Sequence, residues 1–148
     1  MSVKEYKDMI IKVIAQRSDP HKPMKMSVKS GKLEFFVDKL GGDAPSPLEY
    51  LLASLAGCIN IVGNIVAKEM NIKIDDLKIE VEGVFNATKL FTGKGGRAGF
   101  KKIKTKVYVK SNADSKKLEE WLRKVEDRCP IGDNLANPTD IETSVEKM

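Results

Sequence analysis

Residues 46–69, SPLEYLLASLAGCINIVGNIVAKE, form the longest apolar stretch of the chain. Ser46 suits the N-cap of a helix, Pro47 suits its first position, and Glu49 completes an S-x-x-E capping box. The leucines, isoleucines and valines that follow recur at threes and fours, and small residues fill the other sides, as is typical of a buried helix. We therefore predict a central helix about 35 Å long. Internal polar residues and charges at both ends make it a poor membrane span.

The bulk composition indicates one folded domain over residues 1–148. The chain is 41% hydrophobic and 32% charged, and it is long enough to bury a core. Its start, MSVKEYKDMI, lacks the apolar segment of a signal peptide, so we expect a cytoplasmic protein. The net charge of +5 comes mainly from scattered lysines, which favours a solvated surface over a nucleic-acid-binding face. We expect neither nucleic acid nor a membrane as a partner.

Alternating β-branched and polar residues predict strands on both sides of the central helix, at residues 9–16, 24–28, 33–37, 77–87 and 103–109. A second helix is expected over about 115–128, with Asp114 as its cap and Pro130 at its end. A loop and a short final strand at 141–145 should follow. The glycine-rich residues 88–99 do not match a phosphate-binding loop. This order predicts an α+β fold, with antiparallel sheets packed on a long buried central helix and a second helix.

Cys58 and Cys129 are the only cysteines, and His21 is the only histidine. A Cys/His zinc site therefore lacks ligands, and we expect no bound metal or cofactor. His21 is better explained as a solvated loop residue than as a base. The cysteines leave two interpretations open: two unrelated buried thiols, or a redox pair. Cys129 ends the second helix beside an expected flexible loop, which would suit a resolving thiol that must move.

A reactive Cys58 would need a nearby cation, because burial alone raises a thiol pKa. Arg17, at the end of the first expected strand, is the best-placed arginine, and Glu49 could hold it in position. At about 100° per residue, however, Glu49 and Cys58 fall on opposite faces of a straight helix, so both would serve one site only if the helix breaks or Glu49 comes from a second subunit. Glu49 could equally be only a helix cap, and Arg17 only a surface turn residue.

Two segments together resemble a known family. GGDAPSPLEYLLASLAGCINI resembles the cysteine helix of the OsmC/Ohr proteins, which comprise osmotically inducible protein C and the organic hydroperoxide resistance proteins. The second half, with LEEWLRKVEDRCPIGDNLANPTDIE, resembles the family's second cysteine segment, where the cysteine precedes a proline. The likeness covers nearly the whole chain, although Glu49 stands one position later than the family's usual glutamate.

The resemblance implies an intertwined homodimer with sites at the subunit interface. It implies that Cys58 is a peroxidatic thiol, which attacks a hydroperoxide, and that Cys129 resolves the sulfenic acid as an intramolecular disulfide. A dithiol, such as a lipoylated protein, would then act as the external reductant. By the same resemblance, Arg17 would lower the thiol pKa and Glu49 would assist it. The alternative on this scaffold is a non-catalytic redox-sensing or small-molecule-binding homodimer.

Overall fold

The computed structural model describes residues 3–148, and the chain forms two compact units, Met1–Tyr50 and Leu51–Met148. The boundary between them falls in the first turn of helix α1, Pro47–Glu69. Both units combine strands with helical segments, as the predicted α+β class requires. We describe each unit by itself.

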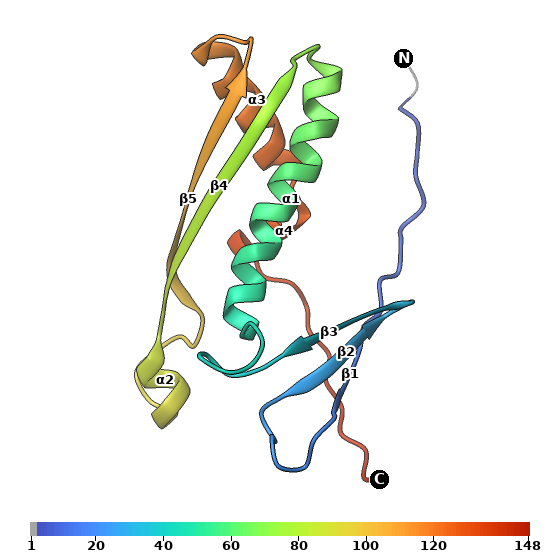
Figure 1. The fold of residues 1–148 in the computed structure, drawn as a ribbon, viewed down its shortest axis with the longest axis vertical. Helices are drawn as coiled ribbons and strands as arrows, with labels where there is room; N and C mark the ends of the chain where they lie inside the picture. Colours follow the sequence, from blue (N-terminus) through green and yellow to red (C-terminus); the bar gives the residue numbers. More distant parts are fainter. Residues whose placement is uncertain (1–2) are drawn as a thin grey trace. The chain divides into compact units, whose positions relative to one another are not determined.

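The first unit is built on a three-stranded antiparallel sheet in the order β1-β2-β3 (Figure 1). Its strands are Ile14–Arg17 (β1), Met26–Ser30 (β2) and Leu33–Val37 (β3). Val28 in the central strand is 6% exposed and lies opposite Ala15 on one side and Phe35 on the other. The strand predicted for 9–16 begins only at Ile14, and residues 9–13 have no regular structure. β2 provides partners for residues 14–17 alone, so the pattern of residues 9–13 has no ladder to join.

The loop before α1 is organised by a buried carboxylate. Asp38 is 8% exposed and accepts hydrogen bonds from the backbone N–H groups of Lys39 (2.7 Å) and Asp43 (3.0 Å). Within the same unit, the hydroxyl of Tyr50 donates to the carbonyl oxygen of Phe36 at 2.7 Å. The loop and the first turn of α1 are therefore both tied to the end of β3.

Helix α1 begins as its sequence predicts. Ser46 and Glu49 form the capping box: the backbone N–H of Ser46 donates to Glu49 Oε2 at 2.7 Å, and that of Glu49 donates to Ser46 Oγ at 3.3 Å. The helix is buried along one face, which carries Leu55, Ile59, Val62, Gly63, Val66 and Ala67. In this single chain its other side is open, since Ile61 is 64% exposed and Ile65 is 45% exposed. α1 is long and apolar enough to cross a membrane, a property it shares with core helices of water-soluble proteins.

The second unit contains a long antiparallel ribbon of β4 (Ile74–Phe85) and β5 (Phe100–Ser111). Ile79 and Val107 are paired in its register, and both pack against the buried residues of the helices. The glycine-rich connection between the strands contains a short helix, α2 (Ala87–Thr92), that the sequence patterns do not predict. Its N-cap Asn86 accepts from the backbone N–H of Lys89 (3.1 Å) and donates to the carbonyl oxygens of Gly95 (2.5 Å) and Arg97 (2.9 Å).

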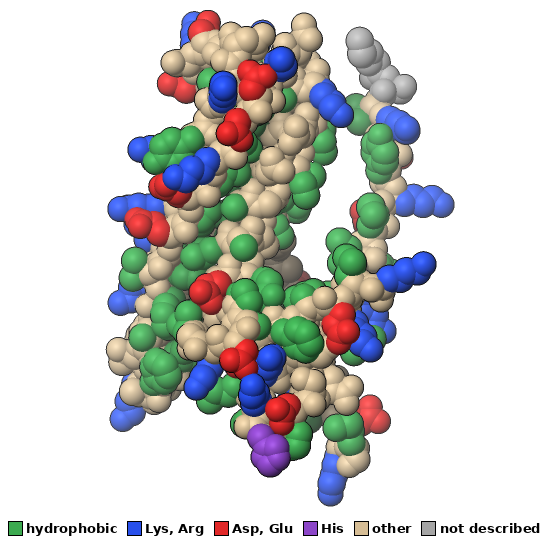
Figure 2. All heavy atoms as spheres, viewed as in Figure 1, with side chains coloured by type: hydrophobic (Ala, Val, Ile, Leu, Met, Phe, Trp, Pro, Cys, Tyr) green, Lys and Arg blue, Asp and Glu red, His purple; other side chains and the backbone are tan. Residues whose placement is uncertain are grey.

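Helix α3 (Ser115–Arg128) confirms the second predicted helix, and the carboxylate of Asp114 accepts the backbone N–H of Lys117 at 2.8 Å as its cap. α1, α3 and the ribbon enclose one core, in which Val66 and Val125 are fully buried. In Figure 2 basic and acidic side chains are interspersed over the ribbon, where Lys78 pairs with Glu80 at 2.7 Å. The lysines of this face are thus part of a mixed, solvated surface.

The structure corrects two predictions for the C-terminal region. The segment after Cys129 is not a flexible loop at its start, because helix α4 occupies Pro130–Ala136. Pro130 ends α3 and also occupies the first position of α4, where its missing N–H costs nothing. The strand predicted for 141–145 is absent, and those residues have no regular structure. Ile141 is 84% exposed and Val145 is 98% exposed, so their alternating pattern is not used in this chain.

Candidate functional site

The two cysteines come together in the second unit. Cys58 lies on α1 and is half-buried, whereas Cys129 lies at the junction of α3 and α4 and is 2% exposed. Both are free thiols, and Cys58 packs against the cluster of buried residues that contains Cys129. The two side chains are close enough for Cys129 to affect the pKa of Cys58. Residues from opposite halves of the sequence thus place two thiols in contact.

The pKa of the Cys58 thiol is raised above its ordinary value. Burial is the main cause, because it disfavours the charged thiolate, and the hydrogen bond with Cys129 adds to it. The backbone N–H of Ile131 opposes both effects by donating to the Cys58 sulfur. In this chain taken alone, Cys58 is therefore held mainly as the neutral thiol at neutral pH.

The first turn of α4 provides backbone N–H donors for both sulfur atoms. Cys129 is the N-cap of this helix, and its Sγ accepts the backbone N–H of Gly132 at 3.3 Å. Pro130 has no N–H to offer, so the first backbone donors of α4 are those of Ile131 and Gly132. One donates to Cys58 and the other to Cys129. The same turn therefore positions Cys129 and favours negative charge on Cys58.

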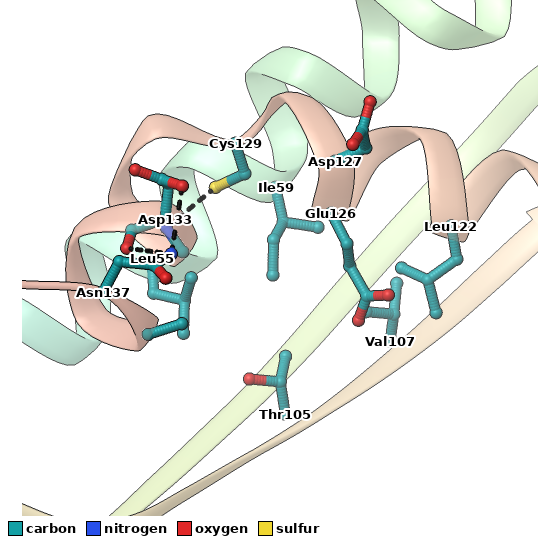
Figure 3. Close-up of a pocket in the computed structure, with 12 residues that line it drawn as sticks. Leu55, Ile59, Thr105, Val107, Leu122, Glu126, Asp127, Cys129, Asp133 and Asn137 are labelled. Carbon is teal, nitrogen blue, oxygen red and sulfur yellow. Dashed lines mark hydrogen bonds between the residues drawn. The ribbon is translucent and has the colours of Figure 1, made fainter.

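A cleft of about 440 Å³ opens beside Cys129 (Figure 3). We call it the Cys129 cleft. Its apolar surface comes from α1, β5 and α3, and includes Leu55, Ile59, Val107 and Leu122. Its polar lining consists of Thr105, Asn137 and the carboxylates of Glu126, Asp127 and Asp133. The cleft is large enough to bind a small organic molecule next to a thiol.

Glu49 and Arg17 lie in the other compact unit. The hydrogen bond from the backbone N–H of Ser46 holds the pKa of the Glu49 carboxyl below its usual range, so its observed partner is the helix start. Arg17 ends β1, opposite Met26, with an exposed side chain. No ion pair involves it among residues 3–148. The catalytic roles predicted for these two residues stay predictions.

The backbone N–H of Ile131 and the carboxylate of Glu126 were not among the predicted site residues. The position of a backbone N–H donor cannot be predicted from residue types. Pro130, however, is typical of the first position of a helix as well as of a helix end, and we used only the second meaning. Cysteine is not among the usual capping residues, which concealed α4 further. Glu126 belongs to a charged helix surface, and only the fold shows that it borders a cleft.

Comparison with known proteins decides the family. Residues 40–144 match the model of the OsmC-like protein family. The chain belongs to the OsmC-like family. The match includes both cysteines and the whole of α1, the ribbon and α3. No curated protein matches the sequence of this OsmC-like protein.

Solved structures share the fold of this OsmC-like protein. The OsmC-like protein from Mycoplasma pneumoniae superposes with a TM-score of 0.77 at 23% identity, over 89% of this chain and 91% of that one. The organic hydroperoxide resistance protein OhrB of Bacillus subtilis gives a TM-score of 0.58 at 23% identity, over 89% and 94% of the two chains. An organic hydroperoxide resistance protein from Elizabethkingia anophelis gives 0.58 at 20% identity, over 90% and 93%.

The residues available in this OsmC-like protein limit which metals it could hold. Within the described residues 3–148, no three His, Cys, Asp or Glu side chains gather in a ligand cluster. His21 is exposed on a loop, where its backbone N–H donates to Asp19 Oδ1 at 2.8 Å. The chemistry that this arrangement offers most directly is that of two neighbouring thiols.

Proposed function

We propose that this protein is a thiol-dependent peroxidase that reduces organic hydroperoxides, and also hydrogen peroxide, with Cys58 as the peroxidatic residue and Cys129 as the resolving residue. The observation that carries the proposal is the proximity of the two thiols: Cys58 packs against the buried cluster that contains Cys129, and Cys129 affects the pKa of Cys58. The likeness of the fold to proteins described as conferring organic hydroperoxide resistance supports the same chemistry.

The first step converts one thiol and one hydroperoxide into a sulfenic acid and an alcohol. The Cys58 thiolate attacks the terminal oxygen of the hydroperoxide, the O–O bond breaks, and the alkoxide that leaves takes up a proton. The sulfur is oxidised by two electrons and the peroxide is reduced by two. The donated N–H of Ile131 stabilises the thiolate that begins this step. With hydrogen peroxide the leaving group becomes water.

The second step joins the two cysteines. The Cys129 sulfur attacks the Cys58 sulfenic acid, an S–S bond forms, and the hydroxyl of the sulfenic acid leaves as water with the thiol proton. A disulfide requires Cα atoms about 4.4–6.8 Å apart, and the packing of Cys58 against the cluster that contains Cys129 favours such an approach. An external dithiol, of the lipoyl type, then exchanges with the disulfide, which restores both thiols and leaves the reductant oxidised.

Activation of Cys58 needs more than the second unit supplies, because its thiol pKa is raised. We assign this role to Arg17, whose guanidinium remains charged in any environment and would lower the thiol pKa at close range. Glu49 would orient Arg17 while it also caps α1. We propose that a homodimer completes the site, and the exposed Ile61 and Ile65 of α1 give a second copy an apolar surface to cover.

One observation favours a second candidate, a non-catalytic redox-sensing homodimer. The raised pKa of Cys58 would make its reaction with peroxide slow if no cation approached the sulfur. Such a protein would form the disulfide once and would be reduced slowly. The two functions differ in turnover, not in the bond that they form.

Steady-state peroxide consumption tests the proposal. With cumene hydroperoxide and dithiothreitol in excess, the parent protein should turn over many times, Cys58→Ser should be inactive, and Cys129→Ser should lose most of its turnover because its sulfenic acid is not resolved. Equal consumption by the parent and Cys58→Ser would exclude the peroxidase function. A single disulfide-forming event without turnover would favour the sensor.

A further inference from the structure

The charge of the Cys129 cleft is opposite to that of the whole chain. The protein carries a net charge of +5, yet none of the residues that line this cleft is a lysine or an arginine, and three of them are carboxylates. The carboxylates border an apolar surface rather than a polar one. A molecule that enters the cleft therefore meets apolar side chains and negative charge together.

Only one of the three carboxylates reaches over the apolar surface. Figure 3 shows the Glu126 side chain directed toward Val107, whereas the carboxylate of Asp127 points away from Thr105 and Val107. The carboxylate of Asp133 accepts a hydrogen bond from the side-chain amide of Asn137, with a distance of 3.1 Å to Oδ1. Glu126 has no ion pair among the described residues that would cancel its charge. Its carboxylate is therefore the one best placed to act on a bound molecule.

The cleft leads to the thiol pair. Cys129 forms part of its wall, and Leu55 and Ile59, which lie one turn before and one residue after Cys58 on α1, form part of its apolar surface. An organic group packed on these side chains would lie beside the sulfur of Cys129, whose neighbour is Cys58. A carboxylate on that group would be repelled by Glu126, and a neutral group would not.

We propose that Glu126 makes the Cys129 cleft select its small-molecule substrate by charge, so that neutral organic hydroperoxides react and hydroperoxides bearing a carboxylate are disfavoured. The proposal rests on the peroxidase function above and adds the substrate class. Glu126 does not take part in the chemistry. It sets specificity through its charge. The apolar body of the substrate provides binding, and the Glu126 carboxylate discriminates against substrates that carry a negative charge.

Two hydroperoxides that differ by one carboxylate test this selection: cumene hydroperoxide and its para-carboxylate. The parent protein should show a kcat/KM for the neutral compound about three- to tenfold above that for the carboxylate, and the ratio should fall as salt is added. Glu126→Gln should lower the ratio well below that of the parent, with Asp127 and Asp133 retaining the remainder. Glu119→Gln, an exposed change on α3 outside the cleft, should leave it as in the parent. A ratio near one in the parent, or an unchanged ratio in Glu126→Gln, would overturn the proposal.

Labelling of Cys129 separates this proposal from the peroxidase function. In a Cys58→Ser background, mass spectrometry follows the rate at which Cys129 is modified by a methanethiosulfonate that carries an ethylammonium or an ethylsulfonate group. Each rate is divided by the rate of the same reagent with a small free thiol. The cationic reagent should be favoured about three- to tenfold, and the added change Glu126→Gln should remove most of that preference. An unchanged preference overturns the selection by Glu126 even if peroxide turnover is rapid. A preference lost in Glu126→Gln supports it even if the protein consumes no peroxide.

Discussion

The indole Nε1–H of Trp121 donates a buried hydrogen bond to the backbone carbonyl oxygen of Gly63, with a nitrogen–oxygen distance of 2.9 Å. Trp121 is 1% exposed, and a Cβ placed on Gly63 would lie 2.8 Å from its Cζ2 atom. Trp121 lies on α3, which ends at Cys129, and Gly63 lies on α1, which carries Cys58. This contact therefore sets how closely the two cysteine-bearing helices approach.

Replacing Gly63 by alanine should destabilise the protein. Alanine gains helix propensity, but its methyl group would collide with the ring of Trp121, and overpacking of this kind costs about 1–3 kcal/mol. Urea unfolding followed by circular dichroism measures the change. Gly57→Ala is the matched control on the same helix, because nothing lies within 4 Å of its added Cβ, and it should stabilise the chain by up to about 1 kcal/mol. Equal effects of the two changes would contradict the account of this contact.

Removing the Cys129 thiol should lower the pKa of Cys58. In Cys129→Ala the hydrogen bond that raises this pKa is lost, while burial of Cys58 remains, so the value should move toward the ordinary thiol value without reaching it. The rate of iodoacetamide alkylation of Cys58 as a function of pH reports the pKa. An equal or higher pKa in the variant would show that the two thiols do not interact as described.

The fold was largely accessible from sequence because its main signals are local. The capping box of Ser46 and Glu49, the cap at Asp114 and the alternation in β4 and β5 each lie within a few residues. The strand predictions that failed depended on the presence of a neighbouring strand. Residues 9–13 and 141–145 alternate like strands, but in this chain they have no strand to pair with. An alternating pattern shows that a segment can form a strand, not that a ladder is present.

For the site, sequence reasoning identified Cys58 and Cys129 but could not tell a redox pair from two separate thiols. Their contact depends on packing between α1, α3 and α4, which no spacing encodes. The interaction of the Ile131 backbone N–H with the Cys58 sulfur could not be predicted, because a loop was expected where α4 lies. Glu49 was suggested both as a cap and as a catalytic residue, and its capping role is confirmed.

Two substitutions at Glu49 separate its two roles. Glutamine can keep the hydrogen bond to the Ser46 N–H, so Glu49→Gln should retain most of the stability that Glu49→Ala loses. If Glu49 also orients Arg17, Glu49→Gln should lower kcat/KM for cumene hydroperoxide while its unfolding midpoint stays close to that of the parent. Full activity in Glu49→Gln would leave Glu49 as a helix cap alone.

The pH dependence of stability provides a further prediction for Glu49. Its pKa is lowered on folding by the Ser46 hydrogen bond, so its carboxylate contributes stability above the ordinary carboxyl pKa, and that contribution is lost as the pH falls through the lower, folded value. Unfolding midpoints measured between about pH 3 and pH 7 should therefore fall less steeply with acid in Glu49→Gln than in the parent. Parallel curves for the two proteins would contradict this assignment.

Arg17→Ala should impair peroxide reduction by raising the pKa of the Cys58 thiol. A shift of one pKa unit corresponds to about tenfold in thiolate at neutral pH, so kcat/KM should fall about tenfold or more and recover as the pH is raised. Arg123→Ala, which changes an exposed arginine on α3, is the control and should behave like the parent. A loss that does not recover at high pH would show that Arg17 does not act through the thiol pKa.

The most direct test of the central claim, that Cys58 and Cys129 form one redox pair, is a single-turnover experiment. Reduced protein is mixed with one equivalent of cumene hydroperoxide, and free thiols and intact mass are followed from the earliest accessible times. The account predicts rapid loss of both thiols and a mass lower by two hydrogens in the parent protein. Cys129→Ser should stop at a stable gain of one oxygen, and Cys58→Ser should show neither change. Persistence of both thiols through many equivalents of hydroperoxide would contradict it.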